Sequence, residues 1–197
     1  MMKFPILVVE DEMITANSII ELLQEEDYWV MGPAKNAAEA IAFCEKGQEP
    51  PAVALCDINI KGPVNGTELA FELRKRYNTE VIFLTAYSDS GTLSKAFEAN
   101  PVMYLVKPYT DSQLLVAIQM AIHKILQKQK DRHFDSLYLT EREKEIATLV
   151  SEGFSSKQIA SRLSISMETV KTHRRRMLQK NNLNSFPQLV FRMRNKA

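Results

Sequence analysis

Five residues with charged or hydroxyl side chains follow directly after short apolar segments of the chain, namely Glu10, Asp11, Asp57, Thr85 and Lys107. If the three carboxylates converge, they repel one another and raise one another's pKa, a cost that a divalent cation such as Mg²⁺ relieves. A carboxylate can attack phosphorus as a nucleophile, while a metal ion and an ammonium group neutralise the phosphoryl oxygens. Gathered at one place, these five residues predict a phosphoryl-transfer site.

The segments around these residues alternate between strand and helix patterns. Short apolar runs predict strands at Ile6–Val9, Trp29–Met31, Val53–Cys56, Val81–Leu84 and Val102–Val106. Apolar residues at helical spacing predict helices at Met13–Glu25, Ala37–Lys46, Thr67–Arg76, Ser90–Glu98 and Asp111 to about Gln127. Five β-then-α units predict an α/β fold with a doubly wound, five-stranded parallel sheet of order 2-1-3-4-5. The carboxyl ends of its strands share one edge, where the five polar residues fall.

Each of these residues also has an ordinary structural explanation when it is taken alone. A Glu-Asp pair after a strand is commonly solvated or lies at a helix N-terminus, and Asp57 could cap a turn. Cys56 is a second candidate nucleophile, but its apolar neighbours and the lack of a nearby histidine favour buried packing. The joint placement of the five polar residues at four strand ends favours the phosphoryl-transfer site.

Residues 4–127 resemble the receiver domain of a two-component response regulator, which has a flavodoxin-like fold. The resemblance is carried by Val8-Val9-Glu10-Asp11-Glu12, Leu55-Cys56-Asp57-Ile58-Asn59, Phe83-Leu84-Thr85-Ala86 and Tyr104-Leu105-Val106-Lys107-Pro108. It implies that Asp57 accepts a phosphoryl group from the phosphohistidine of a histidine kinase. It also implies that Mg²⁺ is bound by Asp11, Asp57 and the backbone carbonyl of Asn59, with Glu10 acting mostly through water.

The same resemblance implies how the phosphoryl group is sensed. Thr85 and Lys107 would contact the acquired phosphoryl group, and Tyr104 would be an aromatic switch that turns inward when Thr85 moves. The Lys107–Pro108 peptide bond is expected to be cis, which the X-Pro linkage permits.

The segment after Asp57 departs from the receiver pattern. Lys61 stands where a proline is usual, and Gly66 lies nine residues after Asp57 rather than eight, so this loop is about one residue longer. A haloacid-dehalogenase-type phosphatase could use the same carboxylates, but it needs a second acid where this chain has Asn59. A phosphatase with turnover is therefore disfavoured.

The charge separates along the chain, although the net charge of the 197 residues is only +1. Residues 1–128 contain 11 Lys and Arg against 17 Asp and Glu, a net charge of −6, and residues 129–197 contain 14 against 7, a net charge of +7. A basic segment of this length is typical of a nucleic-acid-binding domain, although two ordinary solvated surfaces could carry the same charges. The polar stretch 128–136 predicts a linker between a domain of residues 1–127 and one of residues 137–197.

The region after this linker has helix signals and no strand signals. Capping patterns at Thr140, Ser155, Ser166 and Ser185 each predict the start of a helix. A short helix, a tight turn and a new helix across residues 158–166 predict a helix-turn-helix in a small all-α domain. The second of these helices, predicted to end at about Lys180, is rich in basic residues that suit a DNA major groove and its phosphates.

Residues 137–196 resemble the LuxR-type (NarL/FixJ-like) helix-turn-helix through Leu139–Glu143, Gly153–Ala160, Leu163–Ser166, Thr169–His173 and Leu178–Lys180. The resemblance implies that base edges are contacted by Lys171, Thr172 and Arg175. It implies that the DNA backbone is contacted by Ser166, Thr169, His173, Arg176 and Lys180. Arg174 stands where many members have an apolar residue, which leaves its direction open. The last helix, Ser185–Arg194, would pair with its twin in a DNA-bound dimer.

These features predict a transcriptional response regulator, not an enzyme, in which phosphorylation by a histidine kinase or phosphotransfer protein controls dimerisation or interdomain contacts and thereby binding to double-stranded DNA. The apolar runs are too short for a membrane span, no signal peptide is recognisable, and two cysteines cannot build a disulfide framework. We therefore expect a cytoplasmic protein with no membrane partner. Two other classes stay open, namely a constitutive DNA binder with a receiver-like dimerisation domain and a small-molecule phosphatase.

Overall fold

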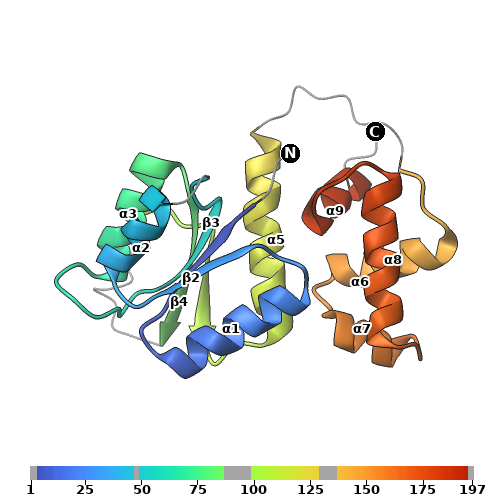
Figure 1. Ribbon diagram of the computed structural model, residues 1–197, viewed down its shortest axis with the longest axis horizontal. Coiled ribbons are helices and arrows are strands. Elements are labelled where there is room, and N and C mark those ends of the chain that lie inside the picture. The colour runs from blue at the N-terminus through green and yellow to red at the C-terminus, as the bar shows by residue number, and fades with distance from the viewer. Residues whose placement is uncertain (1–3, 47–48, 87–98, 129–136, 195–197) are drawn as a thin grey trace. The chain divides into compact units, whose positions relative to one another are not determined.

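The computed structural model describes residues 4–46, 49–86, 99–128 and 137–194. They form two compact units, one of Phe4–Tyr109 and one that begins at Thr110 (Figure 1). The predicted helix Ser90–Glu98 and most of the predicted linker, residues 129–136, lie outside the described residues. None of the helices in the described ranges combines the length and apolarity that a bilayer crossing requires.

A five-stranded parallel sheet forms the centre of the first unit. Its strands are β1 (Ile6–Val9), β2 (Val30–Ala34), β3 (Val53–Asp57), β4 (Glu80–Ala86) and β5 (Met103–Lys107). The strand order β2-β1-β3-β4-β5 confirms the predicted fold. Val9 lies opposite Cys56, and Asp57 lies opposite Leu84, so β3 ends one residue beyond β1 and β4 ends two residues beyond β3. The residues after these strands therefore emerge along one edge.

Helices α1 (Met13–Glu25), α2 (Ala37–Lys46) and α3 (Gly66–Tyr77) flank this sheet. Figure 1 shows α2 and α3 over one face of the sheet and α1 over the other. The bounds of α1 and α2 are those predicted, whereas β2 runs three residues further than predicted, through Gly32 and Pro33. A proline is tolerated there because β2 is an edge strand. The Gly32–Pro33 and Lys107–Pro108 peptide bonds are both cis, the second as predicted.

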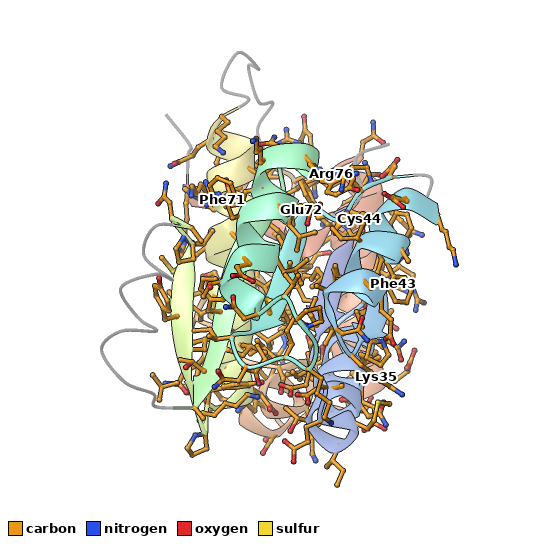
Figure 2. The ribbon with its side chains drawn as sticks, turned by 90° about the vertical axis from the view of Figure 1, so that its left-hand side faces the viewer. Lys35, Phe43, Cys44, Phe71, Glu72 and Arg76 are labelled. Carbon is orange, nitrogen blue, oxygen red and sulfur yellow. The ribbon has the colours of Figure 1, made fainter. Side chains whose placement is uncertain are left out.

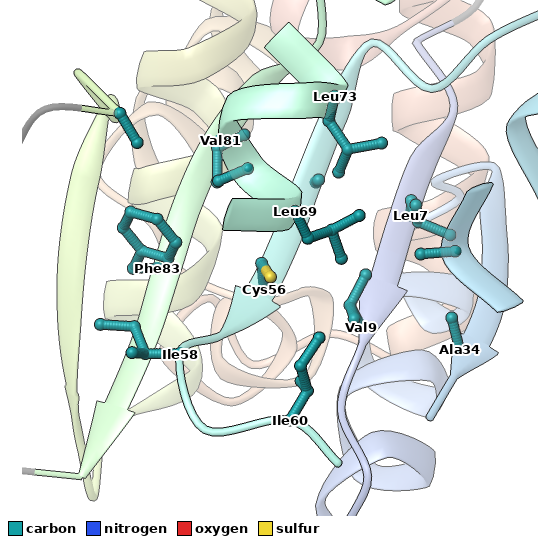
Figure 3. Close-up of a cluster of buried hydrophobic side chains, with 14 of the residues drawn as sticks. Leu7, Val9, Ala34, Cys56, Ile58, Ile60, Leu69, Leu73, Val81 and Phe83 are labelled. Carbon is teal, nitrogen blue, oxygen red and sulfur yellow. The ribbon is translucent and has the colours of Figure 1, made fainter. Parts of the chain in front are cut away.

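The core of the first unit lies between the sheet and the α2–α3 layer (Figure 3). Leu7 and Val9 of β1, Phe83 of β4 and Leu69 of α3 are fully buried in this cluster. Ile6 and Val8, which alternate with them along β1, are also fully buried, as expected for a central parallel strand that is covered on both faces. Burial of each large apolar side chain contributes about 1.5–3 kcal/mol to the free energy of unfolding. The strands are therefore held firmly in place, and so are the residues at their ends.

The second unit is helical in its described part. Its helices are α5 (Asp111–Gln127), α6 (Glu141–Ser151), α7 (Ser156–Arg162), α8 (Met167–Lys180) and α9 (Phe186–Arg194). Thr140 and Ser155 form capping boxes, and the Ser166 side chain accepts a hydrogen bond from the backbone N–H of Thr169, as their positions predict. Ile146, Ile159, Val170, Met177 and Leu189 are fully buried and join α6–α9 into one core.

The predicted capping role of the Ser185 side chain is wrong, although α9 begins at the next residue. The Ser185 Oγ is buried and makes no hydrogen bond with any described residue. Pro187 has no backbone N–H, which removes a donor that a capping side chain would use. The Gln188 side chain instead accepts a hydrogen bond from the backbone N–H of Asn184, at 3.0 Å.

Candidate functional site

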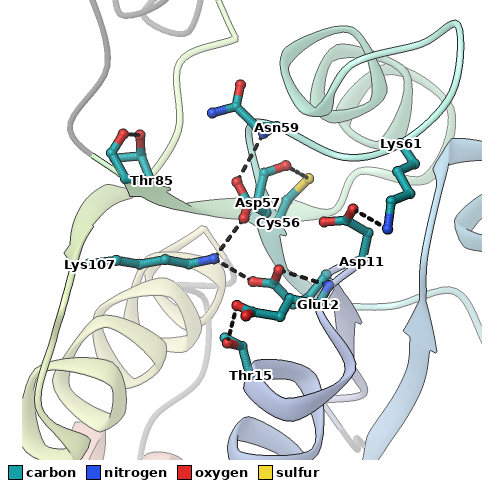
Figure 4. A network of polar contacts seen from close by, with 11 residues as sticks. Asp11, Glu12, Thr15, Cys56, Asp57, Asn59, Lys61, Thr85 and Lys107 are labelled. Atoms are coloured by element: carbon teal, nitrogen blue, oxygen red, sulfur yellow. Dashed lines mark hydrogen bonds and ion pairs between the residues drawn. The ribbon is translucent and has the colours of Figure 1, made fainter.

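The three predicted carboxylates converge at the carboxyl edge of the sheet (Figure 4). One oxygen from each of Glu10, Asp11 and Asp57 lies within 4.8 Å of the other two. Glu10 and Asp57 are buried, at 1% and 7% exposure, whereas Asp11 is half-buried. A cluster of carboxylate oxygens that is open on one side is a donor set that fits Mg²⁺.

Lys107, at the end of β5, contacts the two buried carboxylates of this cluster, those of Glu10 and Asp57, from its inner side. Its Nζ lies 2.6 Å from Glu10 Oε2 and 2.6 Å from Asp57 Oδ2. Burial disfavours the ammonium, but its hydrogen bonds to Asp57 and Glu10 outweigh burial and raise the pKa of Lys107. Burial raises the pKa of Glu10, an effect that Lys107 partly offsets. The site therefore keeps a fixed cation beside the candidate acceptor.

The other oxygen of Asp57 is held by the loop that follows β3. Asp57 Oδ1 accepts a hydrogen bond from the backbone N–H of Asn59 at 2.9 Å. With Lys107 on Oδ2, both oxygens of this carboxylate are oriented before any ligand arrives. Pre-organisation of this kind lowers the cost of positioning a phosphoryl donor.

Thr85 and Tyr104 lie on the two strands beyond Asp57. Thr85 is 2% exposed, and its Oγ1 donates a hydrogen bond to the backbone oxygen of Ala86 at 2.9 Å. The Tyr104 ring packs inward, with its centroid 5.5 Å from that of Phe83. Tyr104 lies on its predicted strand, whereas Thr85, predicted to follow the fourth strand, lies within β4, where its hydroxyl is bonded to the neighbouring residue.

Two further side chains near the site are Cys56, which the sequence offered as a second candidate nucleophile, and Tyr109, which it did not single out. Cys56 is fully buried and its Sγ donates to the backbone oxygen of Asp57 at 3.3 Å. Burial raises the pKa of Cys56, so the thiol is not a nucleophile, which confirms the packing interpretation. Tyr109 is a neighbour of the site that the sequence analysis did not identify. Burial raises the pKa of Tyr109 to about 12, and the positive charge of Lys107 partly offsets this increase. Its position two residues after Lys107 was the only signal available.

The loop after β3 approaches Asp57, the candidate acceptor, through Gly66. The backbone N–H of Gly66 donates to the oxygen of Ile58 at 2.9 Å. A Cβ at Gly66 would overlap the backbone oxygen of Asp57 and lie 2.8 Å from the Cα of Ile58. The side chain of Asn65 caps α3 from the adjoining position. A glycine is therefore required here even though the loop is lengthened.

Replacement of Gly66 by alanine is expected to lower the free energy of unfolding by about 3 kcal/mol, because the added methyl group forces the backbone of Asp57 and Ile58 away from Gly66. Urea denaturation of the purified protein measures this loss. Gly62→Ala is the matched control: Gly62 has a φ of 113° but its nearest neighbour would be 3.9 Å away, so only about 1 kcal/mol of backbone strain is expected. Equal losses in the two variants would contradict the steric explanation.

Helix α8 presents a basic face to solvent in the second unit. Arg175 and Arg176 are exposed, and Lys171, Thr172 and His173 are half-buried. The hydroxyls of Ser166 and Thr169 lie 2.8 Å apart at the N-terminus of the helix. Val170 and Met177 occupy the opposite side, in the core. The predicted DNA-contacting residues therefore share one helix, with its apolar side turned away from them.

Arg174 points into the domain, which answers the question left by the sequence. It is 3% exposed, its Nη1 donates to Ser156 Oγ at 2.7 Å, and its guanidinium lies 4.9 Å from the centroid of the Phe186 ring. Both partners come from other helices, α7 and α9. Arg174 therefore joins the two helices of the helix-turn-helix to α9 and is not available to DNA.

Lys180, at the end of α8, forms an ion pair with the Glu143 carboxylate of α6. Burial of Glu143 acts against its charged form, but the hydrogen bond from Lys180 is among the contacts that together lower the pKa of Glu143. Lys180 thus has a structural partner as well as a position on the basic helix.

The chain matches two known families. Residues 6–119 match the family described as response regulator receiver domain, and residues 137–193 match the luxR family of bacterial regulatory proteins. A phosphorylated receiver joined to a LuxR-type helix-turn-helix defines a two-component response regulator that regulates transcription by binding DNA. The chain belongs to the response regulator family, in its NarL/FixJ branch.

Relatives match the chain over nearly its whole length. The transcriptional regulatory protein TdiR of Thauera aromatica is 33% identical over 194 residues, which cover 94% of this chain and 83% of TdiR. DesR of Bacillus subtilis (strain 168) is 30% identical over 197 residues, covering 98% and 97%. A solved structure of the response regulator StyR is 28% identical, with a TM-score of 0.51 and coverage of 99% and 100%. TdiR and DesR are transcriptional regulatory proteins and StyR is a response regulator, and the family consists of transcription factors rather than enzymes, which removes the phosphatase from the open alternatives.

Proposed function

We propose that Asp57 is the phosphoacceptor of this response regulator and that its phosphorylation requires Mg²⁺ held by Glu10, Asp11, Asp57 and the backbone carbonyl of Asn59. The observation that carries this proposal is the position of Lys107, 2.6 Å from both Glu10 and Asp57, within a cluster of three carboxylates. The ammonium supplies one positive charge to the site, and a divalent cation supplies the rest. Bound there, Mg²⁺ neutralises phosphoryl oxygens during transfer.

In the proposed transfer, an oxygen of Asp57 attacks the phosphorus of a kinase phosphohistidine. The new bond is between phosphorus and the Asp57 oxygen, and the phosphorus–nitrogen bond breaks with its electron pair going to the imidazole. Lys107 moves its hydrogen bond from the Asp57 carboxylate to a phosphoryl oxygen. The Thr85 hydroxyl leaves the oxygen of Ala86 and donates to the phosphoryl group, and the Tyr104 ring, which already packs inward against Phe83, is held in that position by the movement of Thr85.

We propose that α8 is the recognition helix. Its position after α7 and a tight turn supports entry into a major groove, where Lys171, Thr172 and Arg175 would face base edges. The backbone contacts are assigned to Ser166, Thr169, His173, Arg176 and Lys180. Phosphorylation brings two such domains together in a homodimer on adjacent half-sites, which raises their effective concentration on DNA. Because the DNA of a bacterial cell lies in its cytoplasm, we propose that this DNA-binding protein is located there.

The domain assignment follows the same division of function. We propose a receiver at residues 1–127, a linker at 128–136 and a DNA-binding domain at 137–197. The receiver family match ends at residue 119, inside α5, and the luxR family match begins at 137, which supports a boundary between them. The division into compact units differs from this boundary, because the second unit begins at Thr110 and so includes α5.

Titration of the full-length protein onto genomic DNA fragments, with and without a small acyl phosphate and Mg²⁺, tests the proposed control. Tighter binding in the presence of the phosphodonor is expected, because dimerisation adds a second half-site contact. The same affinity in both conditions would favour the constitutive DNA binder.

Two variants of α8 test the assignment of DNA contacts. Lys171→Ala is expected to cost about 1–3 kcal/mol on the preferred site and to relax sequence preference, because a base contact is lost. Arg176→Ala, exposed on the same helix, is expected to weaken binding to all sequences and to reduce the salt dependence by about one unit of slope. Competition binding at several salt concentrations separates the two, and indistinguishable behaviour would contradict the proposed docking.

A further inference from the structure

Lys61 lies at the outer side of the acid cluster, in the loop that follows β3 (Figure 4). Its Nζ is 3.1 Å from Asp11 Oδ2. Lys107 bonds Glu10 and Asp57 from the inner side, so each of the three carboxylates has an ammonium partner. Two ammonium groups therefore occupy the acids that are proposed to bind Mg²⁺, and an incoming cation competes with them for the same oxygens.

The two lysines differ in how readily they can leave. The Lys107 side chain is 21% exposed, and it has two buried carboxylate partners. The Lys61 side chain is 78% exposed and has one partner, Asp11. Exposed ion pairs of this kind contribute only about 0–1 kcal/mol. Lys61 is thus the ammonium that a metal ion displaces at low cost.

The surroundings of Lys61 provide room for the displaced side chain. A groove of about 710 Å³ lies between α2, α3 and the loop, lined by Lys61 itself and by apolar residues such as Ile41, Pro63 and Val64. The aliphatic part of a lysine side chain packs well on such a surface while its ammonium stays in water. Figure 2 shows the α2–α3 face, where Arg76 pairs with Glu72, a residue that also lines the groove.

We propose that Lys61 is a built-in competitor of Mg²⁺. Its ammonium holds Asp11 Oδ2 in the metal-free protein and leaves that oxygen when Mg²⁺ binds. Lys61 thereby sets the Mg²⁺ concentration at which the receiver becomes ready for phosphorylation, without taking part in phosphoryl transfer. The proposal rests on the metal site proposed above, and it gives a role to the residue by which the loop departs from the usual receiver pattern.

Isothermal titration of the full-length protein with MgCl₂ at low ionic strength tests this role. Lys61→Met keeps the length of the side chain and removes its charge, and it is expected to tighten Mg²⁺ binding about two- to fivefold, the value of an exposed ion pair. The gain should shrink as KCl is added, because salt screens the competing ammonium. At saturating Mg²⁺, the variant and the wild type should be phosphorylated by a small acyl phosphate at the same rate.

The matched control is Lys75→Met, which removes an exposed lysine charge from α3. This variant should bind Mg²⁺ as the wild type does, and an equal gain in both variants would overturn the proposal by showing a general effect of net charge. Unchanged or weaker Mg²⁺ binding by Lys61→Met, with normal binding by the wild type, would overturn the competitor role alone. If the wild type binds no Mg²⁺, the proposed metal site fails and the role of Lys61 fails with it.

Discussion

The Asp57→Asn variant is expected to take up no acid-labile phosphate from a small acyl phosphate in the presence of Mg²⁺, and its DNA affinity should not respond to the phosphodonor. The carboxamide cannot form the acyl phosphate bond, because it lacks the anionic oxygen that attacks phosphorus. The fold should persist, since an amide oxygen can still accept the hydrogen bond from the N–H of Asn59. Phosphate-affinity electrophoresis and DNA titration measure both effects.

A matched substitution away from the site separates this loss from a general effect of removing an acidic charge. Asp27, exposed at the end of α1, has a positive φ that asparagine tolerates. Asp27→Asn should be labelled as the wild type is and should keep the response of DNA affinity to the phosphodonor. Undiminished labelling of Asp57→Asn would show that another residue is the acceptor.

The Lys107→Met variant is expected to lose about 3 kcal/mol of stability in the absence of divalent cations, because it leaves two buried carboxylates without their shared cation. Addition of Mg²⁺ should return more stability to the variant than to the wild type, since the metal ion replaces the missing positive charge. Urea denaturation with Mg²⁺ and with a chelator measures both values. An unchanged stability without metal would contradict the role of Lys107 as the inner cation.

The pH dependence of stability provides a second check on Lys107. Its pKa is raised in the folded protein, so its stabilising contribution is complete below the ordinary lysine pKa and is lost as the pH rises through the raised value. The wild type should therefore lose stability in this alkaline range more steeply than Lys107→Met does. The Lys75→Met variant, which keeps the inner cation, should follow the wild type.

The placement of the site residues could be predicted because it follows from topology. Parallel strands bring their carboxyl ends to one edge, so Asp11, Asp57 and Lys107 meet whatever the details of packing. The start and end of α1 followed from apolar periodicity alone. The extension of β2 could not be predicted in the same way, because Gly32 and Pro33 have low strand propensity and are accepted only on an edge strand.

The contacts that could not be predicted are those between side chains distant in sequence. The ion pair of Lys61 with Asp11 depends on the path of a loop whose length departs from the usual receiver pattern. Arg174 would be placed outward by its charge, yet Ser156 and Phe186 from two other helices provide a buried position for it. Lys180 was assigned to DNA from its place on a basic helix, and its partner Glu143 lies 37 residues earlier. Spacing along one helix carries no information about such partners.

Chemical trapping of the phosphorylated residue tests the central claim most directly. Borohydride reduces an aspartyl phosphate to an alcohol, which converts the acceptor to homoserine, and peptide mass spectrometry then locates it. The proposed site predicts homoserine at position 57 after treatment with phosphodonor and Mg²⁺, and its loss when the metal is chelated. Homoserine at a different position, or an equal yield at position 57 with and without Mg²⁺, would contradict the account.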